Sequence, residues 1–337
     1  MKKLLSVVIA AATFGITGQA MAAAQITGAG SSFIYPVLSK WAATYHKKTG
    51  VEINYQPIGS GGGLQQIYSH TVTFAASDMP LHKTQLTAKH LQQFPMIIGG
   101  IVPIVHIVGI QTNQLVLDGN VLAKIYEGKI TYWNDPQIVA LNPSLKGKLP
   151  HNRIVSVHRA DGSGTTFNFT NYLDKVNSDW KLHIGSNTVV NWPGFGIGAK
   201  GNAGVASQVA HLPNAIGYVE YAYAKQNHLT VTKMKNAAGS VVTADADTFA
   251  AAAKNAHYHA DNGFYLILTN QPGADSWPIV ATTFVLVPTN SKHPKQVKQA
   301  LRFFTWSYHH GKKAASQLDY VAIPKKVYKQ VIKTWHK

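Results

Sequence analysis

Apolar and polar positions follow two periods along the chain, and short runs typical of strands alternate with stretches of helical spacing. The first hundred residues predict strands over 25–28, 51–58 and 73–77, and helices over 34–48 and 64–70. The middle of the chain predicts a strand over 154–159, a helix over 165–176, a strand near 216–219, and a hairpin over 229–243 that turns at Ala238 and Gly239. This alternation predicts an α/β fold.

Two longer apolar runs stand out, over 96–108 and 277–288, and the second is followed by helical stretches rich in Lys. Each run could cross between two domains, and the length of the chain exceeds the usual size of a single core. We therefore expect one discontinuous domain formed by 23–105 and 278–337, and one inserted domain formed by 106–277.

The first residues are typical of a secretory signal peptide: Lys2 and Lys3, a short apolar run, and small residues up to Ala22. We expect 1–22 to be removed and the mature chain to be soluble, since no later stretch reaches about 18 uninterrupted apolar residues. The sequence holds no cysteine, which excludes disulfides and an N-terminal lipid on cysteine. A free periplasmic protein is expected rather than a lipid-anchored one.

The chain is strongly basic, with a formal net charge of +17 that becomes +15 without Lys2 and Lys3. Such a field attracts anions, whether small ligands, anionic lipid or nucleic acid. From Asn290 to the end there are ten lysines and Arg302 against one carboxylate, Asp319. A solvated basic face on terminal helices and a docking surface are both compatible with this pattern.

Three Gly/Ser/Thr-rich turns, over 27–33, 58–63 and 159–166, each lie between a predicted strand and a predicted helix. Glycine lets the backbone approach a ligand, and the first N–H groups of a helix have no helical partner. With the positive end of the helix dipole, each turn is a candidate anion cradle. Each is also compatible with a plain helix cap, in which a hydroxyl satisfies its own helix. The hydroxyl donors are Ser32, Ser60, Ser163 and Thr165.

Arg159 in the third turn suits bidentate contact with a tetrahedral oxyanion, although an internal ion pair with Asp161 is also possible. Asp78 follows the strand over 73–77, and an ionised carboxylate can only accept a hydrogen bond. Protonated phosphate can donate one, whereas sulfate cannot. Asp78 would therefore favour phosphate over sulfate, unless it is an ordinary turn residue.

The motifs TGAGSSF (27–33), IGS (58–60), ASD (76–78) and RADGSGT (159–165) resemble the periplasmic phosphate-binding proteins of bacterial ABC importers, the PstS family. GYVEYAYA (217–224) and WPI (277–279) extend the resemblance over essentially the whole mature chain. Three positions depart from the family pattern. Ser32 stands where the family commonly has Thr, and Gly61 stands where we expect Ser. His158 stands where the family commonly has another basic residue.

This resemblance implies a two-lobed periplasmic binding protein of type II, in which each lobe is a mixed sheet flanked by helices and two hinge crossings join the lobes. It implies one desolvated phosphate in the cleft, delivered to membrane permease subunits of an ABC importer by a monomer that has no catalytic residues, metal or cofactor. The ligand-binding residues would be Ser32, Phe33, Ser60, Asp78, Arg159, Asp161, Ser163, Gly164 and Thr165.

Other functions are weaker matches. Gly196-x-Gly198-x-x-Gly201 fits the dinucleotide fingerprint but lacks a clean preceding strand. A serine acyl-enzyme would use Ser178 and Lys181, but the order of its motifs is reversed. Nucleic-acid binding would need the aromatics at 303–308, whose helical spacing is more typical of a core. A binding protein for sulfate or molybdate is the nearest alternative, and Asp78 is the discriminator.

Overall fold

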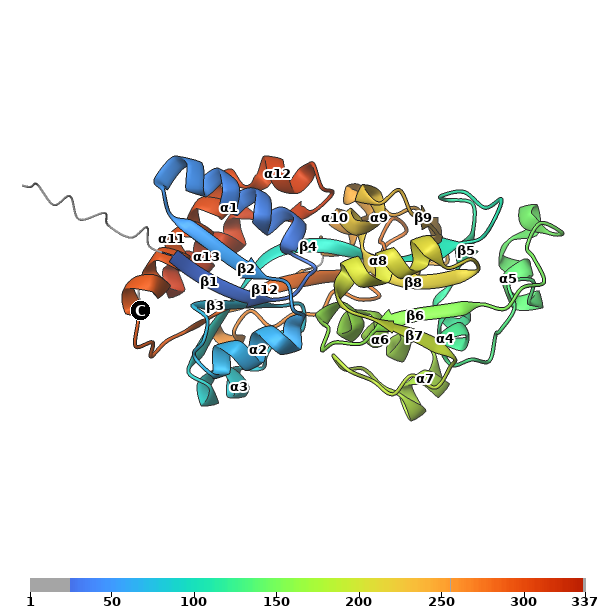
Figure 1. Ribbon diagram of the computed structural model, residues 1–337, viewed down its shortest axis with the longest axis horizontal. Coiled ribbons are helices and arrows are strands. Elements are labelled where there is room, and N and C mark those ends of the chain that lie inside the picture. Colours follow the sequence, from blue (N-terminus) through green and yellow to red (C-terminus); the bar gives the residue numbers. More distant parts are fainter. Residues whose placement is uncertain (1–24, 255, 336–337) are drawn as a thin grey trace, which may run out of the picture.

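The computed structural model describes residues 25–254 and 256–335, so the predicted signal peptide lies outside the described residues. Figure 1 shows two halves side by side, each with strands at its centre and helices around them. We call the half that contains β1, β2, β3 and β12 the first lobe, and the half that contains β6, β7 and β8 the second lobe. The bounds of these elements follow.

The described strands are β1 (Gln25–Gly30), β2 (Glu52–Gln56), β3 (Phe74–Ser77), β4 (Leu91–His106), β5 (Val116–Leu117), β6 (Val155–Arg159), β7 (Gly196–Ala199), β8 (Ala215–Glu220), β9 (Thr230–Val231), β10 (Lys233–Lys235), β11 (Val241–Val242), β12 (Val280–Pro288) and β13 (Val321–Ala322). Their main path runs β2-β1-β3-β12-β4-β8-β6-β7, with β9 and β13 also paired to β4. Strands β1, β2 and β3 are parallel, as are β6, β7 and β8.

The described helices are α1 (Tyr35–Thr49), α2 (Ser60–Tyr68), α3 (Lys83–Ala88), α4 (Gly119–Tyr126), α5 (Pro136–Leu141), η1 (Pro143–Leu145), α6 (Gly164–Val176), α7 (Ser178–His183), α8 (Gly201–His211), α9 (Tyr221–Gln226), α10 (Ala246–Ala253), η2 (Ala260–Asn262), α11 (Pro294–His310), α12 (Lys312–Ser316) and α13 (Lys325–Thr334). Helix α1 ends where Gly50 adopts the left-handed conformation, and its N–H bonds the carbonyl of His46.

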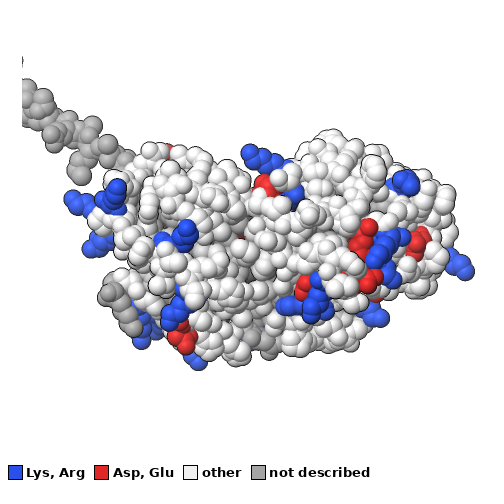
Figure 2. Space-filling model, turned by 90° about the horizontal axis from the view of Figure 1, so that it is seen from below, with Lys and Arg blue, Asp and Glu red and all other residues white. Residues whose placement is uncertain are grey.

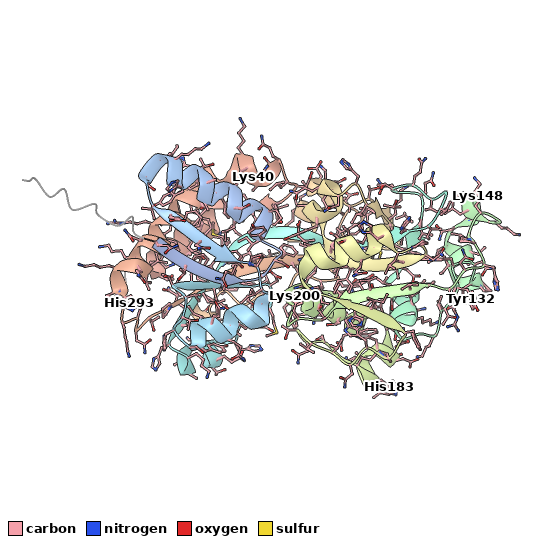
Figure 3. All side chains as sticks on the ribbon, viewed as in Figure 1. Lys40, Tyr132, Lys148, His183, Lys200 and His293 are labelled. Carbon is pink, nitrogen blue, oxygen red and sulfur yellow. The ribbon has the colours of Figure 1, made fainter. Side chains whose placement is uncertain are left out.

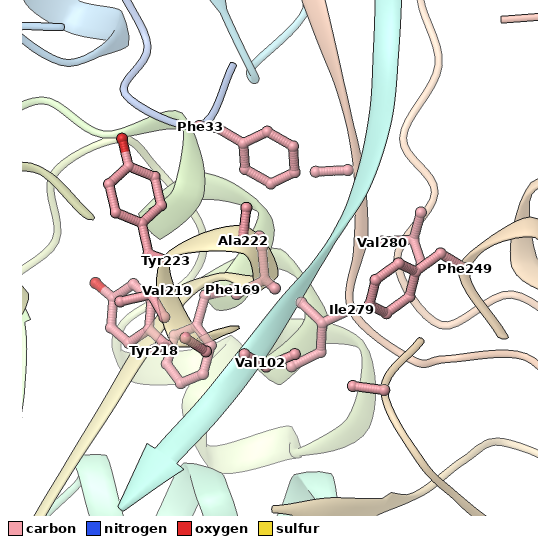
Figure 4. Packing of buried hydrophobic residues seen from close by; sticks show 14 of the residues in the cluster. Phe33, Val102, Phe169, Tyr218, Val219, Ala222, Tyr223, Phe249, Ile279 and Val280 are labelled. Atoms are coloured by element: carbon pink, nitrogen blue, oxygen red, sulfur yellow. The ribbon is translucent and has the colours of Figure 1, made fainter. Parts of the chain in front are cut away.

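Strand β4 belongs to both lobes. Its first part, through Gly100, pairs with β12, and its second part, from Ile101 on, pairs with β8. The chain returns beside it before β12, where the indole of Trp277 donates to the carbonyl of Ile101. Figure 4 shows Val102 on this strand and Ile279 beside it, among large buried side chains of both lobes. The two apolar runs of the sequence therefore lie beside each other at the junction of the lobes.

The two-lobed mixed α/β architecture expected from the resemblance is confirmed, and most predicted elements lie within a few residues of their expected bounds. One prediction needs correction. Only β10 and β11 form the expected hairpin, because β9 pairs with β4 instead. The glycines at 196–201, which fit the dinucleotide fingerprint, lie at a strand-to-helix turn, since Gly196–Ala199 forms β7 and Gly201 begins α8.

A segment between α10 and β12 reaches across to the first lobe. The hydroxyl of Tyr258 bonds that of Thr282 at 2.7 Å, and Gln93 donates to the carbonyl of Gly263 at 2.8 Å.

Among the described residues, no helix is both long and apolar enough to cross a bilayer.

Candidate functional site

The site lies between the lobes, where β1 and β3 of the first lobe and β6 and β7 of the second lobe end. In α/β sheets, ligands bind outside the carboxyl ends of parallel strands, because the following helices present their free N–H groups there. The structure has the two lobes in contact at this position. The N–H of Gly61 donates to the carbonyl of Gly162 at 2.8 Å, and the N–H of Gly164 donates to Ser60 Oγ at 3.1 Å.

The first turn, after β1, is fixed from several directions. Ser31 Oγ accepts from the N–H of Phe33 at 3.0 Å, so this turn is capped from within. Tyr223 donates to the carbonyl of Ser32, and Tyr320 donates to the carbonyl of Phe33, both at 2.6 Å. Both carbonyls are thereby occupied by tyrosine hydroxyls.

Ser32 itself is 3% exposed and faces the second lobe. Its Oγ accepts from the backbone N–H of Asn202 at 3.1 Å and from Asn202 Nδ2 at 2.9 Å. As a hydroxyl that accepts twice, it still has its own O–H to donate.

The second turn depends on glycine and on Ser60, the first residue of α2. Gly59 has a φ of 88°, and a Cβ there would lie 2.3 Å from Asp161 Oδ2 of the other lobe. Ser60 is fully buried, and its Oγ accepts from the N–H groups of Asp78 (3.3 Å) and Gly164 (3.1 Å). Both of these hydrogen bonds are accepted by the oxygen, so the hydroxyl proton remains available to donate to a ligand.

The third turn carries the only arginine of the site. Arg159, at the end of β6, is 4% exposed. Its Nε donates to Asp161 Oδ1 at 2.7 Å and its Nη2 to Asp161 Oδ2, while the N–H of Gly201 donates to Oδ1 at 3.0 Å. Burial raises the pKa of Asp161, but the hydrogen bonds and charge of Arg159 outweigh it and hold the pKa below its usual value. The expected internal ion pair is present.

This ion pair leaves one end of the guanidinium unused. Arg159 Nη1 is buried and has no hydrogen-bond partner among the described residues. A buried charged donor without a partner is costly, so Nη1 is suited to an anion that enters the cleft.

The rest of the third turn begins α6. Ser163 Oγ accepts from the N–H of Thr166 at 3.0 Å, which makes Ser163 a helix cap. Gly164 lies so close to the first lobe that a Cβ there would be 2.7 Å from the backbone N of Asp78. Thr165 Oγ1 accepts from Asn202 Nδ2 at 3.2 Å. The structure thus brings all nine predicted residues to one region.

Asp78 lies at the end of β3 and is 1% exposed. Its Oδ2 accepts from Ser31 Oγ at 2.6 Å and its Oδ1 from Thr283 Oγ1 at 2.7 Å. Its carbonyl accepts from Asn168 of the second lobe at 2.8 Å. Burial raises the pKa of Asp78 to about 6, although the two hydroxyls and the charge of Arg159 act against it. Each carboxylate oxygen holds one protein donor and can accept another hydrogen bond.

Three residues of this region are not among the predicted ligand-binding residues: Ser31, Thr283 and Asn202. Asn202 contacts Ser32 and Thr165, and its Oδ1 accepts from the N–H of Glu220 at 2.9 Å. It follows Gly201, the last glycine of the pattern that fits the dinucleotide fingerprint. The turn between β7 and α8 is a fourth strand-to-helix turn at the cleft. Its glycines are the sequence feature that could have indicated this turn.

A metal site is a separate question. Within 25–254 and 256–335, no group of three or more His, Asp or Glu side chains lies close enough together to hold a metal ion. The donors that converge here are N–H groups, hydroxyls and a guanidinium, which suit an oxyanion.

Comparisons with known proteins show the family to which the chain belongs. Residues 16–309 match the family described as the PBP superfamily domain. The chain is 50% identical over 311 residues to the phosphate-binding protein PstS of Xylella fastidiosa, which covers 92% of this chain and 85% of that protein. It is 50% identical over 310 residues to PstS of Haemophilus influenzae, with 92% of each covered.

Solved structures share the fold at lower identity. A high-affinity periplasmic phosphate-binding protein bound with phosphate has a TM-score of 0.74 at 20% identity, over 91% of this chain and 92% of that one. An ABC-type phosphate transport receptor from Vibrio cholerae has a TM-score of 0.56 at 16% identity, over 89% and 100%. At these identities, the likeness concerns the fold alone.

The raised pKa of Asp78 predicts a pH dependence of stability. The folded protein holds this proton with a pKa of about 6, against 3.8 for an unperturbed Asp, so the stability contributed by protonation is complete below about pH 4 and is lost as the pH rises through 6. Asp78→Asn removes the ionisation. In urea unfolding without ligand, the free energy of unfolding of the variant should rise by about 3 kcal/mol relative to that of the natural protein as the pH goes from 4 to 8. Asp275→Asn, at an exposed position, serves as the control. A pH-independent difference for Asp78→Asn would contradict the assignment.

Proposed function

Because the chain belongs to the PstS family of phosphate-binding proteins, we propose that it binds inorganic phosphate between its lobes with high affinity and delivers it to an inner-membrane ABC importer. The observation that carries the proposal is the buried guanidinium of Arg159, with Nε and Nη2 held by Asp161 and Nη1 without a partner. The pair fixes the plane of the guanidinium, so its free donors are oriented before the ligand enters.

Asp78 gives the proposed site its selectivity. Its carboxylate accepts the proton that phosphate carries near neutral pH, whereas sulfate would bring an unprotonated oxygen against a buried negative charge. The pKa of Asp78 is raised because the buried site solvates that charge poorly.

The other residues of the proposed ligand shell are Ser32, Phe33, Ser60, Ser163, Gly164 and Thr165, with Asp161 acting through Arg159. The N–H groups of Phe33 and Gly164 donate to Ser31 Oγ and Ser60 Oγ in this structure, so they would exchange these partners for the ligand. The hydroxyls of Ser32, Ser60, Ser163 and Thr165 accept from protein N–H groups and keep their own protons for the ligand. Hydrogen bonds to a charged group contribute about 1.5–3 kcal/mol each, so a shell of this size supports micromolar or tighter binding.

We propose that the first lobe comprises 23–105 and 278–337 and the second lobe 106–277, with the hinge in β4 and in the segment before β12. Opening would separate Gly61 from Gly162 and Ser60 from Gly164, since each pair joins the two lobes. The protein acts as a monomeric binding protein without catalysis, metal or cofactor. We propose that its predicted signal peptide directs it to the periplasm.

The first test of this function compares two anions. Millimolar phosphate should raise the melting temperature of the purified mature chain by several degrees, since a ligand that binds only the folded state stabilises it. Sulfate at equal concentration should leave the melting temperature unchanged because Asp78 repels it. Equal stabilisation by both anions would show that Asp78 does not select the ligand, and stabilisation by neither would refute phosphate binding.

The second test concerns Arg159. Arg159→Ala removes the bidentate donor and leaves Asp161 without its partner, so titration calorimetry should show phosphate affinity reduced at least tenfold. Arg153→Ala is the matched control, because Arg153 is exposed and lies over the ring of Tyr132. Unchanged affinity in the first variant, or equal losses in both, would overturn the role of Arg159.

A further inference from the structure

Positive charge collects on the C-terminal part of the first lobe without acidic partners. Beyond Asn290, ten lysines and Arg302 accompany one carboxylate, Asp319, and that carboxylate pairs with Lys225. Among the described residues, no Lys or Arg beyond 290 lies in an ion pair. On the face in Figure 2, blue residues predominate on the left half, which is the first lobe, whereas both signs intermingle on the right half. The phosphate site does not use these charges.

Two helices carry most of this charge as stripes. On α11, Lys295, Lys298 and Arg302 follow one another at intervals of three and four residues, which places them on one helix face. On α13, Lys326, Lys329 and Lys333 repeat the same spacing. All six side chains are exposed.

A groove of about 610 Å³ lies between α11 with the segment before it and the end of α13, and half of its lining residues are apolar. Val297, Leu301, Ile332 and Trp335 line it and are half-buried, while the exposed Lys298 and Arg302 stand at its edge. No Asp or Glu is among its lining residues. A second depression of about 480 Å³ shares Val297, Leu301 and Trp335, so the apolar surface continues past Trp335.

We propose that this face, formed by α11, α13 and the groove between them, docks on an anionic lipid bilayer. The lysine stripes contact acidic headgroups, and the groove takes an apolar part of one lipid. Each Lys or Arg near an anionic surface strengthens binding, and buried apolar surface adds to it. The absence of carboxylates from the groove lining fits a negatively charged amphiphile better than a neutral one.

Nucleic acid is the other polyanion that such charge could attract, but the aromatic residues do not serve it. Phe303 and Phe304 are fully buried in the core, and Trp306 and Tyr308 are half-buried against other aromatic rings. Binding of single strands relies on exposed aromatic rings on which bases stack. The charges are also almost all Lys, which act as point charges and lack the fork geometry used to read bases.

Docking in this way would hold the protein on the membrane, so that its search for a membrane-embedded partner is confined to two dimensions. The surface lies away from the cleft and involves none of the nine site residues. Lipid binding is therefore independent of phosphate binding, and each can fail without the other.

The test is co-sedimentation of the mature protein with vesicles. Vesicles of phosphatidylglycerol and phosphatidylcholine should bind the protein at low salt, whereas vesicles of phosphatidylcholine alone should not. Lys298→Glu/Arg302→Glu should lower the partition coefficient at least tenfold, because four units of charge change at the groove. The matched control, Lys146→Glu/Lys148→Glu, changes the same charge at the far end of the second lobe. Figure 3 places Lys148 there and His293, which precedes α11, at the opposite end.

Both double variants should keep the increase in melting temperature caused by phosphate, which shows that they are folded. No binding to phosphatidylglycerol vesicles, or equal losses in the two variants, would overturn the proposal. Tighter binding to a DNA oligonucleotide than to the vesicles, lost in Lys298→Glu/Arg302→Glu, would also overturn it in favour of nucleic acid.

Discussion

The pairing of Arg159 with Asp161 is the interaction on which the site depends. A buried guanidinium is costly to desolvate, and a single carboxylate satisfies only part of its five donors. Asp161 takes two of them and also receives the N–H of Gly201, so the pair is tied to both the third and the fourth turn. The guanidinium is therefore held in place with some of its N–H donors unpaired, and a tetrahedral anion can accept hydrogen bonds from them.

The other elements of the cleft follow from the need to surround that anion with donors and exclude water. Glycines at 59 and 164 let the two lobes approach to distances that a Cβ would forbid. Tyr223 and Tyr320 hold the carbonyls of the first turn, and Asn202 joins Ser32 to Thr165 across the cleft. Asp78 adds a carboxylate acceptor whose oxygens can still accept from a ligand, which lets the proposed site distinguish anions by protonation.

Local chemistry made much of this predictable. Glycine, serine and threonine at strand ends indicated the three turns, and the apolar runs at 96–108 and 277–288 indicated the junction of the lobes at β4 and β12. Thr283 was not predictable, because its contact with Asp78 depends on the register of β12 against β3, 205 residues apart in sequence. Asn202 was missed because β7 is four residues long and rich in glycine. The groove between α11 and α13 depends on how these helices pack, which their periodicity does not encode.

The most direct measurement of the central claim is the ratio of phosphate to sulfate affinity in Asp78→Asn, determined by titration calorimetry at pH 8 beside the natural protein. The amide of Asn can donate to sulfate and lacks the charge that repels it, so the ratio should fall at least tenfold. A variant that kept the full preference for phosphate would show that selectivity resides elsewhere in the cleft, and would contradict the role given to Asp78.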